Sequence, residues 1–167
     1  VAAIGTILVE AIRVSSEHVK HIDELKEKSL IAVPSDSVNG GRALLLLQAN
    51  GLITLSDKAG LEATERDIVE NPKKLRFKSI EAAQLPRILP DVDGAVINGN
   101  YALEAGFNPT EDAVLLEGSE SPYANIVVVH EDSKDDEKFA ILMKHLNSEK
   151  VAQFILSTYN GGVTPAF

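Results

Sequence analysis

The sequence predicts an α/β fold with mainly parallel sheets. Short apolar runs rich in β-branched residues alternate along the chain with longer segments of helical pattern, as expected for strands joined by helices. Two of these runs, at residues 30–33 and 94–98, lead through small polar residues and glycine into a helical segment. A third run, at residues 126–129, is continuously apolar, which predicts a strand buried on both faces.

The first predicted elements are a strand over residues 6–14 and a polar helix over residues 15–28, with two serines as candidate N-caps. His18 and His21 lie three residues apart in the polar segment. That spacing is compatible with metal binding, but the sequence specifies no third ligand. A charged, solvated face is the better interpretation, and no metal is expected.

The segment 30–52 is the most informative stretch of the chain. Its apolar run predicts a buried strand, which Pro34 ends because proline has no N–H to donate to a neighbouring strand. The small polar residues that follow suit a loop or a helix N-cap; they are Ser35, Asp36, Ser37 and Asn39. After a pair of glycines, a helix is predicted from Arg42 to the residues just before Gly51.

Arg42 follows the glycine pair at the predicted start of this helix. A helix N-terminus attracts anions, and a guanidinium there can hold a carboxylate through two parallel hydrogen bonds. On the pattern alone, a solvated first-turn residue beside a simple turn is the better interpretation. Neither the dinucleotide fingerprint G-x-G-x-x-G nor the phosphate loop G-x-x-x-x-G-K-[ST] occurs in the sequence.

The remaining elements follow from local periodicity and from Gly, Pro and Asn stops. In order, they are a loop-rich passage at 54–63, a short helix at 65–72, a strand at 73–80, at most a short helix at 81–93, a strand at 94–98, a helix at 100–106, an edge strand at 115–116, the strand at 126–129, and helices at 135–146 and 148–159. The apolar stripe of the helix at 135–146 has ordinary core spacing.

Composition narrows the class of protein. With 167 residues, the chain suits one sizeable domain or two small lobes. A net charge of −9 argues against nucleic acid as a partner, because phosphate binding needs a basic face. The absence of cysteine excludes disulfides, a thiol nucleophile and thiolate metal sites. The apolar start at residues 1–9 is too short to span a membrane, and its Val1 suggests a processed chain or a fragment.

Three strand ends carry polar residues suited to binding: residues 35–42, 98–100 and 123–125. In α/β folds, ligands bind at such ends. Asparagine amides both donate and accept hydrogen bonds, and an arginine binds a carboxylate, so this set suits a small zwitterion. No activated nucleophile or acid–base pair stands at suggestive spacing, so we expect neither an enzyme nor a cofactor.

The run SLIAVPSDSVNGGRALLLLQANGLITL resembles a stretch of the NlpA-type methionine-binding lipoproteins, which are the substrate-binding components of methionine ABC importers. Further similar runs follow in order: DIVENPKKLRF, EAAQLPRILPDVDGAVINGNYALEAGFNP, ESPYANIVVV and GGVTPAF. The resemblance covers essentially the whole chain. It implies the type II periplasmic-binding-protein-like fold, in which a ligand cleft lies between two α/β lobes.

The resemblance also implies a domain organisation. Residues 20–107 are expected to form the second lobe, residues 1–19 the hinge and a partial first lobe, and residues 108–167 the crossover strand and C-terminal helices of the first lobe. The family's N-terminal third, with its lipidation cysteine, has no counterpart in the sequence given. The first lobe is therefore expected to be incomplete, and this 167-residue chain is expected to bind methionine poorly and to self-associate.

The family's ligand-contacting residues correspond, by position in matching motifs, to Arg42, Asn98, Asn100, Asn125, Tyr123 and Asn39. Ser35 stands where the family usually has Asn. The resemblance implies a solute-binding protein for methionine, or a related amino acid or dipeptide, that delivers its ligand to an ABC transporter permease. It also implies an extracytoplasmic location in the cell envelope, with the membrane reached only through a lipid anchor.

Two other interpretations remain at this point. The chain could be a truncated structural module of the same family, with no usable ligand site. An enzyme on the same fold is the weaker alternative, because no partner constellation surrounds the four histidines, His18, His21, His130 and His145.

Overall fold

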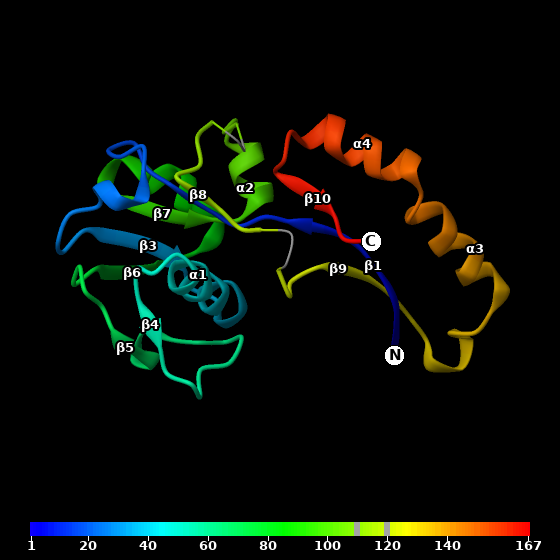
Figure 1. Ribbon diagram of the computed structural model, residues 1–167. Helices are drawn as coiled ribbons and strands as arrows, with labels where there is room; N and C mark the ends of the chain where they lie inside the picture. The colour runs from blue at the N-terminus through cyan, green and yellow to red at the C-terminus, as the bar shows by residue number, and fades with distance from the viewer. Residues whose placement is uncertain (109–110, 119–120) are drawn as a thin grey trace. The chain divides into compact units, whose positions relative to one another are not determined.

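The computed structural model describes residues 1–108, 111–118 and 121–167, which form two compact units (Figure 1). The larger unit is one continuous stretch, Ile12–Glu117, and the smaller unit combines Val1–Ala11 with Gly118–Phe167. The larger unit contains the whole of the predicted second lobe, residues 20–107. It extends further at both ends because short strands on either side of that range belong to its sheet.

The larger unit is built on a five-stranded sheet of order β6-β3-β7-β2-β8. The strands are β2 (Arg13–Ser15), β3 (Leu30–Pro34), β6 (Arg76–Ile80), β7 (Gly94–Ile97) and β8 (Leu115–Leu116). β3 pairs in parallel with β6 and β7, whereas β2 pairs antiparallel with β7 and β8. The sheet is therefore mixed, and the expectation of mainly parallel sheets holds only for β6, β3 and β7.

Two apolar clusters cover the two faces of this sheet. Side chains alternate along a strand, so Ile31 and Val33 of β3 join the cluster under α1 (Ser37–Ala49). Ala32 joins the cluster with η3, a 3-10 helix at Ala82–Asp91, and α2 (Gly99–Glu104). The predicted strands at 30–33 and 94–98 are thus confirmed, and both are buried on two faces.

The helix α1 begins five residues before its predicted start. Asp36 is its N-cap, and the Asp36 side chain accepts a hydrogen bond from the backbone N–H of Asn39. The glycine pair therefore lies inside the helix. A Cβ on Gly41 would collide with the Leu61 carbonyl oxygen, and one on Gly40 would lie 2.9 Å from the Pro34 carbonyl oxygen. The glycines thus admit neighbouring backbone and do not form a loop around a ligand.

The predicted helix at residues 15–28 is wrong. The structure has only η1, a 3-10 turn at Ile22–Glu24. The Ser16 hydroxyl accepts hydrogen bonds from the N–H groups of His18 and Val19, at 3.0 and 3.2 Å. Such side-chain bonds compete with the helical pattern, and the segment closes with Lys28 at a φ of 67°.

Side-chain hydrogen bonds also replace the predicted helix in the segment at 65–72. The predicted short helix is a 3-10 turn, η2 (Glu65–Asp67), followed by β5 (Ile68–Glu70), which pairs with β4 (Thr54–Leu55) in a separate antiparallel sheet. The turn is fixed by a capping box in which the Asp67 carboxylate accepts from the N–H and the hydroxyl of Thr64, both at 2.8 Å.

The smaller unit contains an antiparallel sheet of order β10-β1-β9, formed by β1 (Ala2–Glu10), β9 (Asn125–Val129) and β10 (Val163–Pro165). The strand predicted over 6–14 is thus divided between β1 here and β2 in the larger unit. The strand at 126–129 is present, but Ile126 is 49% and Val128 47% exposed. Burial on both faces was therefore a wrong prediction, because no element among the described residues covers that side.

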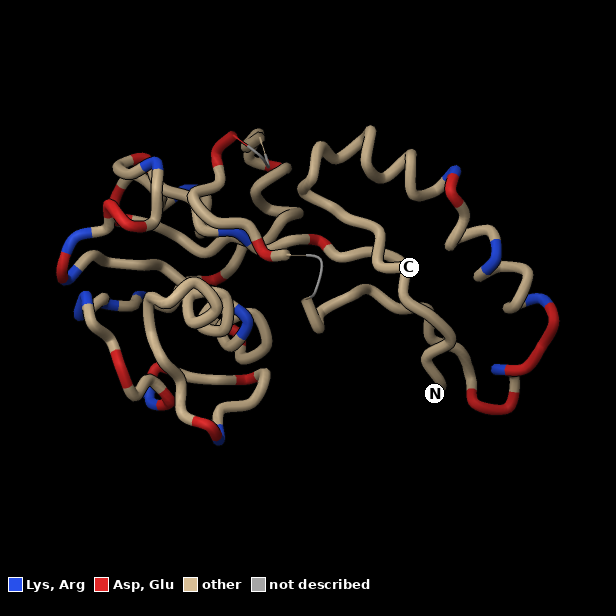
Figure 2. Tube along the Cα trace, viewed as in Figure 1, with Lys and Arg blue, Asp and Glu red and all other residues tan. Residues whose placement is uncertain are grey.

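The helices of the smaller unit are α3 (Glu137–Leu146), preceded by the 3-10 turn η4 (Glu131–Ser133), and α4 (Glu149–Tyr159). Ser148 is the N-cap of α4, and its hydroxyl accepts a hydrogen bond from the backbone N–H of Val151 at 3.4 Å. Acidic residues gather before α3 and at its first position (Figure 2), near the positive end of the helix; they are Glu131, Asp132, Asp135, Asp136 and Glu137. None of the described helices has the length and apolar composition needed to cross a membrane.

Candidate functional site

Two predicted strand ends come together at one edge of the five-stranded sheet. β3 and β7 are parallel neighbours, so the residues that follow them meet at their carboxyl ends. Asn39 lies in the first turn of α1, after β3, and Asn98 is the N-cap of α2, after β7. The Asn98 Nδ2 donates to the Asn39 Oδ1 at 2.7 Å.

Arg42 lies three residues after Asn39, on the same face of α1. Its residue surface is 8% exposed, so the solvated interpretation that the pattern alone favoured is wrong. The Nε donates to both carboxylate oxygens of Glu117, at 3.0 and 3.1 Å, and the Nη2 pairs with Glu117 Oε2. The guanidinium therefore binds a carboxylate through two nitrogens, which is the grip predicted for a ligand.

Glu117 is a residue that sequence reasoning missed. It follows the edge strand β8 and is fixed by the backbone of Ile12, whose N–H donates to Glu117 Oε2 at 3.3 Å. The Glu117 N–H in turn donates to the Ile12 carbonyl at 3.0 Å. The ion pair joins residues 75 positions apart, so no local signal could have revealed it.

Asp36 adds a second acidic group beside the asparagines. The Asn39 Nδ2 donates to Asp36 Oδ1 at 3.1 Å and to Oδ2 at 3.2 Å. At the other end of this chain of contacts, the Asn98 Oδ1 is buried and has no hydrogen-bond partner among the described residues. The sequence indicated Asp36 as a cap, but not its contact with the Asn39 side chain.

The other predicted ligand residues are distributed over both units. Asn100 is exposed in the first turn of α2, in the larger unit. Tyr123 and Asn125 belong to the smaller unit, where the Tyr123 N–H donates to Ser121 Oγ at 3.2 Å and Asn125 begins β9. That all six residues form one ligand site stays a prediction.

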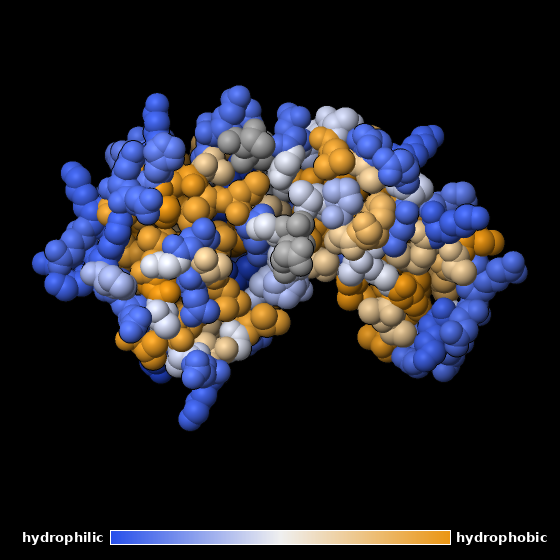
Figure 3. Space-filling model, in the orientation of Figure 1, coloured by the Kyte–Doolittle hydropathy of each residue, from blue (hydrophilic) through white to orange (hydrophobic). Residues whose placement is uncertain are grey.

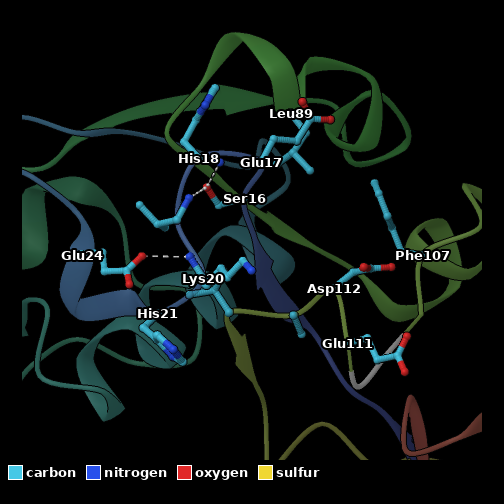
Figure 4. A pocket seen from close by; sticks show the side chains of 13 residues that line it. Ser16, Glu17, His18, Lys20, His21, Glu24, Leu89, Phe107, Glu111 and Asp112 are labelled. Atoms are coloured by element: carbon cyan, nitrogen blue, oxygen red, sulfur yellow. Dashed lines mark hydrogen bonds between the residues drawn. The ribbon is translucent and has the colours of Figure 1, made fainter.

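A cavity of about 920 Å³ lies elsewhere in the larger unit (Figure 4). Its lining includes His18, His21, Phe107 and Asp112, and none of the six predicted ligand residues. The Lys20 N–H donates to Glu24 Oε2 at 3.0 Å and lowers the pKa of that carboxyl. Within the described part of the chain, no three His, Cys, Asp or Glu side chains gather as a metal site.

A buried polar pair on β2 was also missed. Arg13 and Ser15 lie two residues apart and hence on one face of the strand, and both are 1% exposed. The Arg13 Nη1 donates to the Asn108 carbonyl at 3.3 Å, while Arg13 Nε, Arg13 Nη2 and Ser15 Oγ have no partner among the described residues. Burial lowers the pKa of Arg13, against the opposing influence of Asp112.

Comparison with known proteins identifies the family. The family model described as NlpA lipoprotein matches residues 1–167. The chain belongs to this family. It is 44% identical over 162 residues to the D-methionine-binding lipoprotein MetQ of Escherichia coli K12, covering 96% of this chain and 60% of that protein. The chain spans about 60% of the length of the curated relatives it matches.

Solved structures of related proteins confirm the predicted fold. A nutrient-binding protein of Burkholderia cenocepacia bound to methionine has a TM-score of 0.86 at 44% identity, covering 99% of this chain and 70% of that one. An ABC transporter periplasmic substrate-binding protein of Coxiella burnetii also has a TM-score of 0.86 at 44% identity, covering 99% and 69%. These three related proteins are described as binding proteins, and none of their descriptions is that of an enzyme.

Proposed function

We propose that this chain is the substrate-binding component of an ABC importer, which binds methionine or a closely related amino acid or dipeptide and delivers it to the permease. Support comes from the NlpA lipoprotein family, from the MetQ relative named for D-methionine and from the methionine-bound Burkholderia structure. The lipoprotein family also supports an extracytoplasmic location in the cell envelope.

The observation that carries the proposal is that Arg42 binds a carboxylate through two nitrogens, next to the side-chain amides of Asn39 and Asn98. An amino acid presents a carboxylate and an ammonium group a short distance apart. Arg42 offers charge-assisted donors, and Asn39 and Asn98 lie next to it at the same sheet edge. The Nε–Nη2 edge of Arg42 faces Glu117, so a ligand that uses this same edge must displace that carboxylate.

The other predicted residues extend this site. Asn100 follows Asn98 in the first turn of α2. Tyr123 and Asn125, from the smaller unit, would contact the ligand when the two lobes close around it, and closure would create the surface that the permease recognises. These contacts are part of the proposal.

The test is calorimetric titration of methionine into the protein as produced from its natural gene. Arg42→Ala is expected to weaken binding by about 2–5 kcal/mol, because a charge-assisted pair in a water-poor site is lost. Arg42→Lys keeps the charge but not the planar fork, so it should also bind more weakly than the wild type. Arg87→Ala, which removes an exposed arginine from η3, serves as the matched control.

Because Arg42→Ala also removes the contacts of Glu117 with Arg42, the thermal unfolding of each variant is measured alongside. If Arg42→Ala folds and binds methionine as tightly as the wild type, Arg42 is not the carboxylate anchor. If the natural chain itself gives no heat with methionine or related ligands, the structural module becomes the better description.

A further inference from the structure

We propose that Asp36 sets the orientation of the Asn98 side chain through Asn39, so that Asn98 presents a carbonyl oxygen to an N–H group of the ligand. Asp36 is thus a positioning residue, two hydrogen bonds away from the group it orients. The role in ligand selection rests on the proposed function, whereas the orientation itself is a property of the larger unit alone.

The first step is the Asn39 amide. An ionised carboxylate only accepts hydrogen bonds. Both oxygens of Asp36 lie close to Asn39 Nδ2, at 3.1 and 3.2 Å, and Asp36 Oδ1 also receives the Asn39 backbone N–H at 2.9 Å. Rotating the Asn39 amide by half a turn would place its oxygen against two carboxylate oxygens. The nitrogen of Asn39 is therefore held toward Asp36, and its oxygen faces away.

The second step is the Asn98 amide. Asn39 Oδ1 accepts from Asn98 Nδ2 at 2.7 Å. With the Asn39 oxygen fixed, the reversed Asn98 amide would bring two carbonyl oxygens to that distance. Asn98 must therefore donate to Asn39, and its own oxygen must point elsewhere. That oxygen is buried and lacks a donor among the described residues, and a buried acceptor without a donor is costly.

The third step is the partner of that oxygen. Asn98 as a whole is half-buried, and its contact residue Asn39 shares a face of α1 with Arg42. The cluster thus combines the donors of Arg42, which a ligand reaches by displacing Glu117, with an acceptor on Asn98. A zwitterionic amino acid matches this polarity, with its carboxylate on Arg42 and its ammonium on Asn98 Oδ1. The site should therefore select ligands that carry an N–H donor beside the carboxylate.

The test compares Asp36→Ser with the wild type. Serine retains an acceptor for the helix N-cap, but its side chain is too short to hold the Asn39 amide as the carboxylate does. Asp67→Ser is the matched control, because Asp67 is also a capping carboxylate of the larger unit and has no contact with Asn39. Each protein, as produced from its natural gene, is titrated with L-methionine and with 4-(methylthio)butanoate, which lacks the amino group.

Asp36→Ser should weaken methionine binding by about tenfold, the loss expected for a hydrogen bond to a charged group. It should leave the affinity for the amino-free analogue within about twofold, because Arg42 is unchanged. Asp67→Ser should change neither affinity. Equal losses for the two ligands, or no loss of methionine affinity, would overturn the assignment of Asn98 as the ammonium acceptor.

A second measurement needs no ligand. Side-chain amide resonances of Asn39 and Asn98 should both shift in Asp36→Ser and remain in place in Asp67→Ser. An unchanged Asn98 resonance in Asp36→Ser would show that Asp36 does not control its orientation. If methionine fails to bind even the wild-type protein, the proposed function and the ligand role fail together, and the resonances still decide whether the orientation is set by Asp36.

Discussion

The two units differ in how completely they bury their apolar residues. In the larger unit, two clusters cover both faces of the sheet, and every member of these clusters lies within residues 12–117. Among the described residues of the smaller unit, only five apolar residues are buried: Val9, Ala11, Val129, Ile155 and Val163. A unit whose core is complete within one continuous stretch does not depend on partners outside that stretch.

The smaller unit shows the opposite arrangement. Helix α3 has no buried residue, and α4 has only Ile155. Large apolar side chains of this unit lie on its surface (Figure 3), among them Ile126, Val128, Ile141, Leu142, Phe154 and Leu156. Exposed apolar groups of this kind mark a surface that other atoms normally cover. We therefore expect the two units to differ in stability, mobility and association.

The largest expected difference is in amide hydrogen exchange. Protection follows local stability, which is highest in well-packed core strands. Amides of β3 and β7 should exchange at least about a hundredfold more slowly than those of β1 and β9. Exchange measured by NMR or mass spectrometry on the 167-residue chain gives the comparison. Equal protection in the two sheets would mean that the smaller unit is as stable as the larger one.

The second largest difference is expected in the loss of stability when a leucine is truncated to alanine in each unit. Leu47 is fully buried at 0% exposure, whereas Leu142 on α3 is 41% exposed. Leu47→Ala should lower the free energy of unfolding of the larger unit by about 2–5 kcal/mol, because it removes packed atoms and leaves a cavity. Leu142→Ala should lower the free energy of unfolding of the smaller unit by only about 0.5 kcal/mol. Urea unfolding followed by circular dichroism provides both values, and similar losses would contradict the contrast.

Self-association is expected to follow from the smaller unit. Sedimentation velocity of the 167-residue chain should show dimers or larger species whose proportion rises with concentration. Phe154→Ser should lower that proportion, because it removes an aromatic side chain that is 61% exposed on α4. Val69→Ser, at an apolar position with the same 61% exposure in the larger unit, should leave it unchanged. A monomeric wild-type chain would refute this expectation.

The smallest expected effect concerns the capping box of the larger unit. The backbone N–H and hydroxyl of Thr64 lower the pKa of Asp67 below its ordinary value of 3.8. This carboxylate therefore stabilises the fold above about pH 4, and the contribution disappears as the pH falls through the lowered pKa. Asp67→Asn should reduce stability more at pH 7 than at pH 2. An equal effect at both values would exclude the ionised cap as the cause.

Local signals in the sequence predicted much of the larger unit. The strands at 30–33 and 94–98 are followed by Pro34 and by an Asn-Gly pair that opens the next helix, and the structure confirms both strands. The stop at Gly51 is also confirmed, since its φ of 72° suits glycine. The polar stretch at 15–28 failed because one serine side chain redirects its backbone, which helical periodicity does not reveal.

In the candidate site, too, the sequence predicted residues with a local signal and missed those placed by distant contacts. Strand-end reasoning pointed to Arg42, Asn39 and Asn98, which the structure brings to one edge of the sheet. It did not reveal Glu117, because a pair 75 residues apart leaves no local pattern. The exposure of the strand at 126–129 was equally hidden, since burial depends on which other elements pack against a strand and not on its own residues.

The continuity of the larger unit has a consequence for the order of folding. A chain synthesised from its N-terminus completes residues 12–117 before β9 and β10 exist, so the larger unit can fold first. β1 must wait, because Ala2 pairs with Val129 and Leu8 with Pro165. Pairing β1 with β9 closes a long loop of chain between them, which carries an entropic cost. The folded larger unit removes most of it, since the hydrogen bond from Glu117 to Ile12 at 3.0 Å already holds the loop ends together.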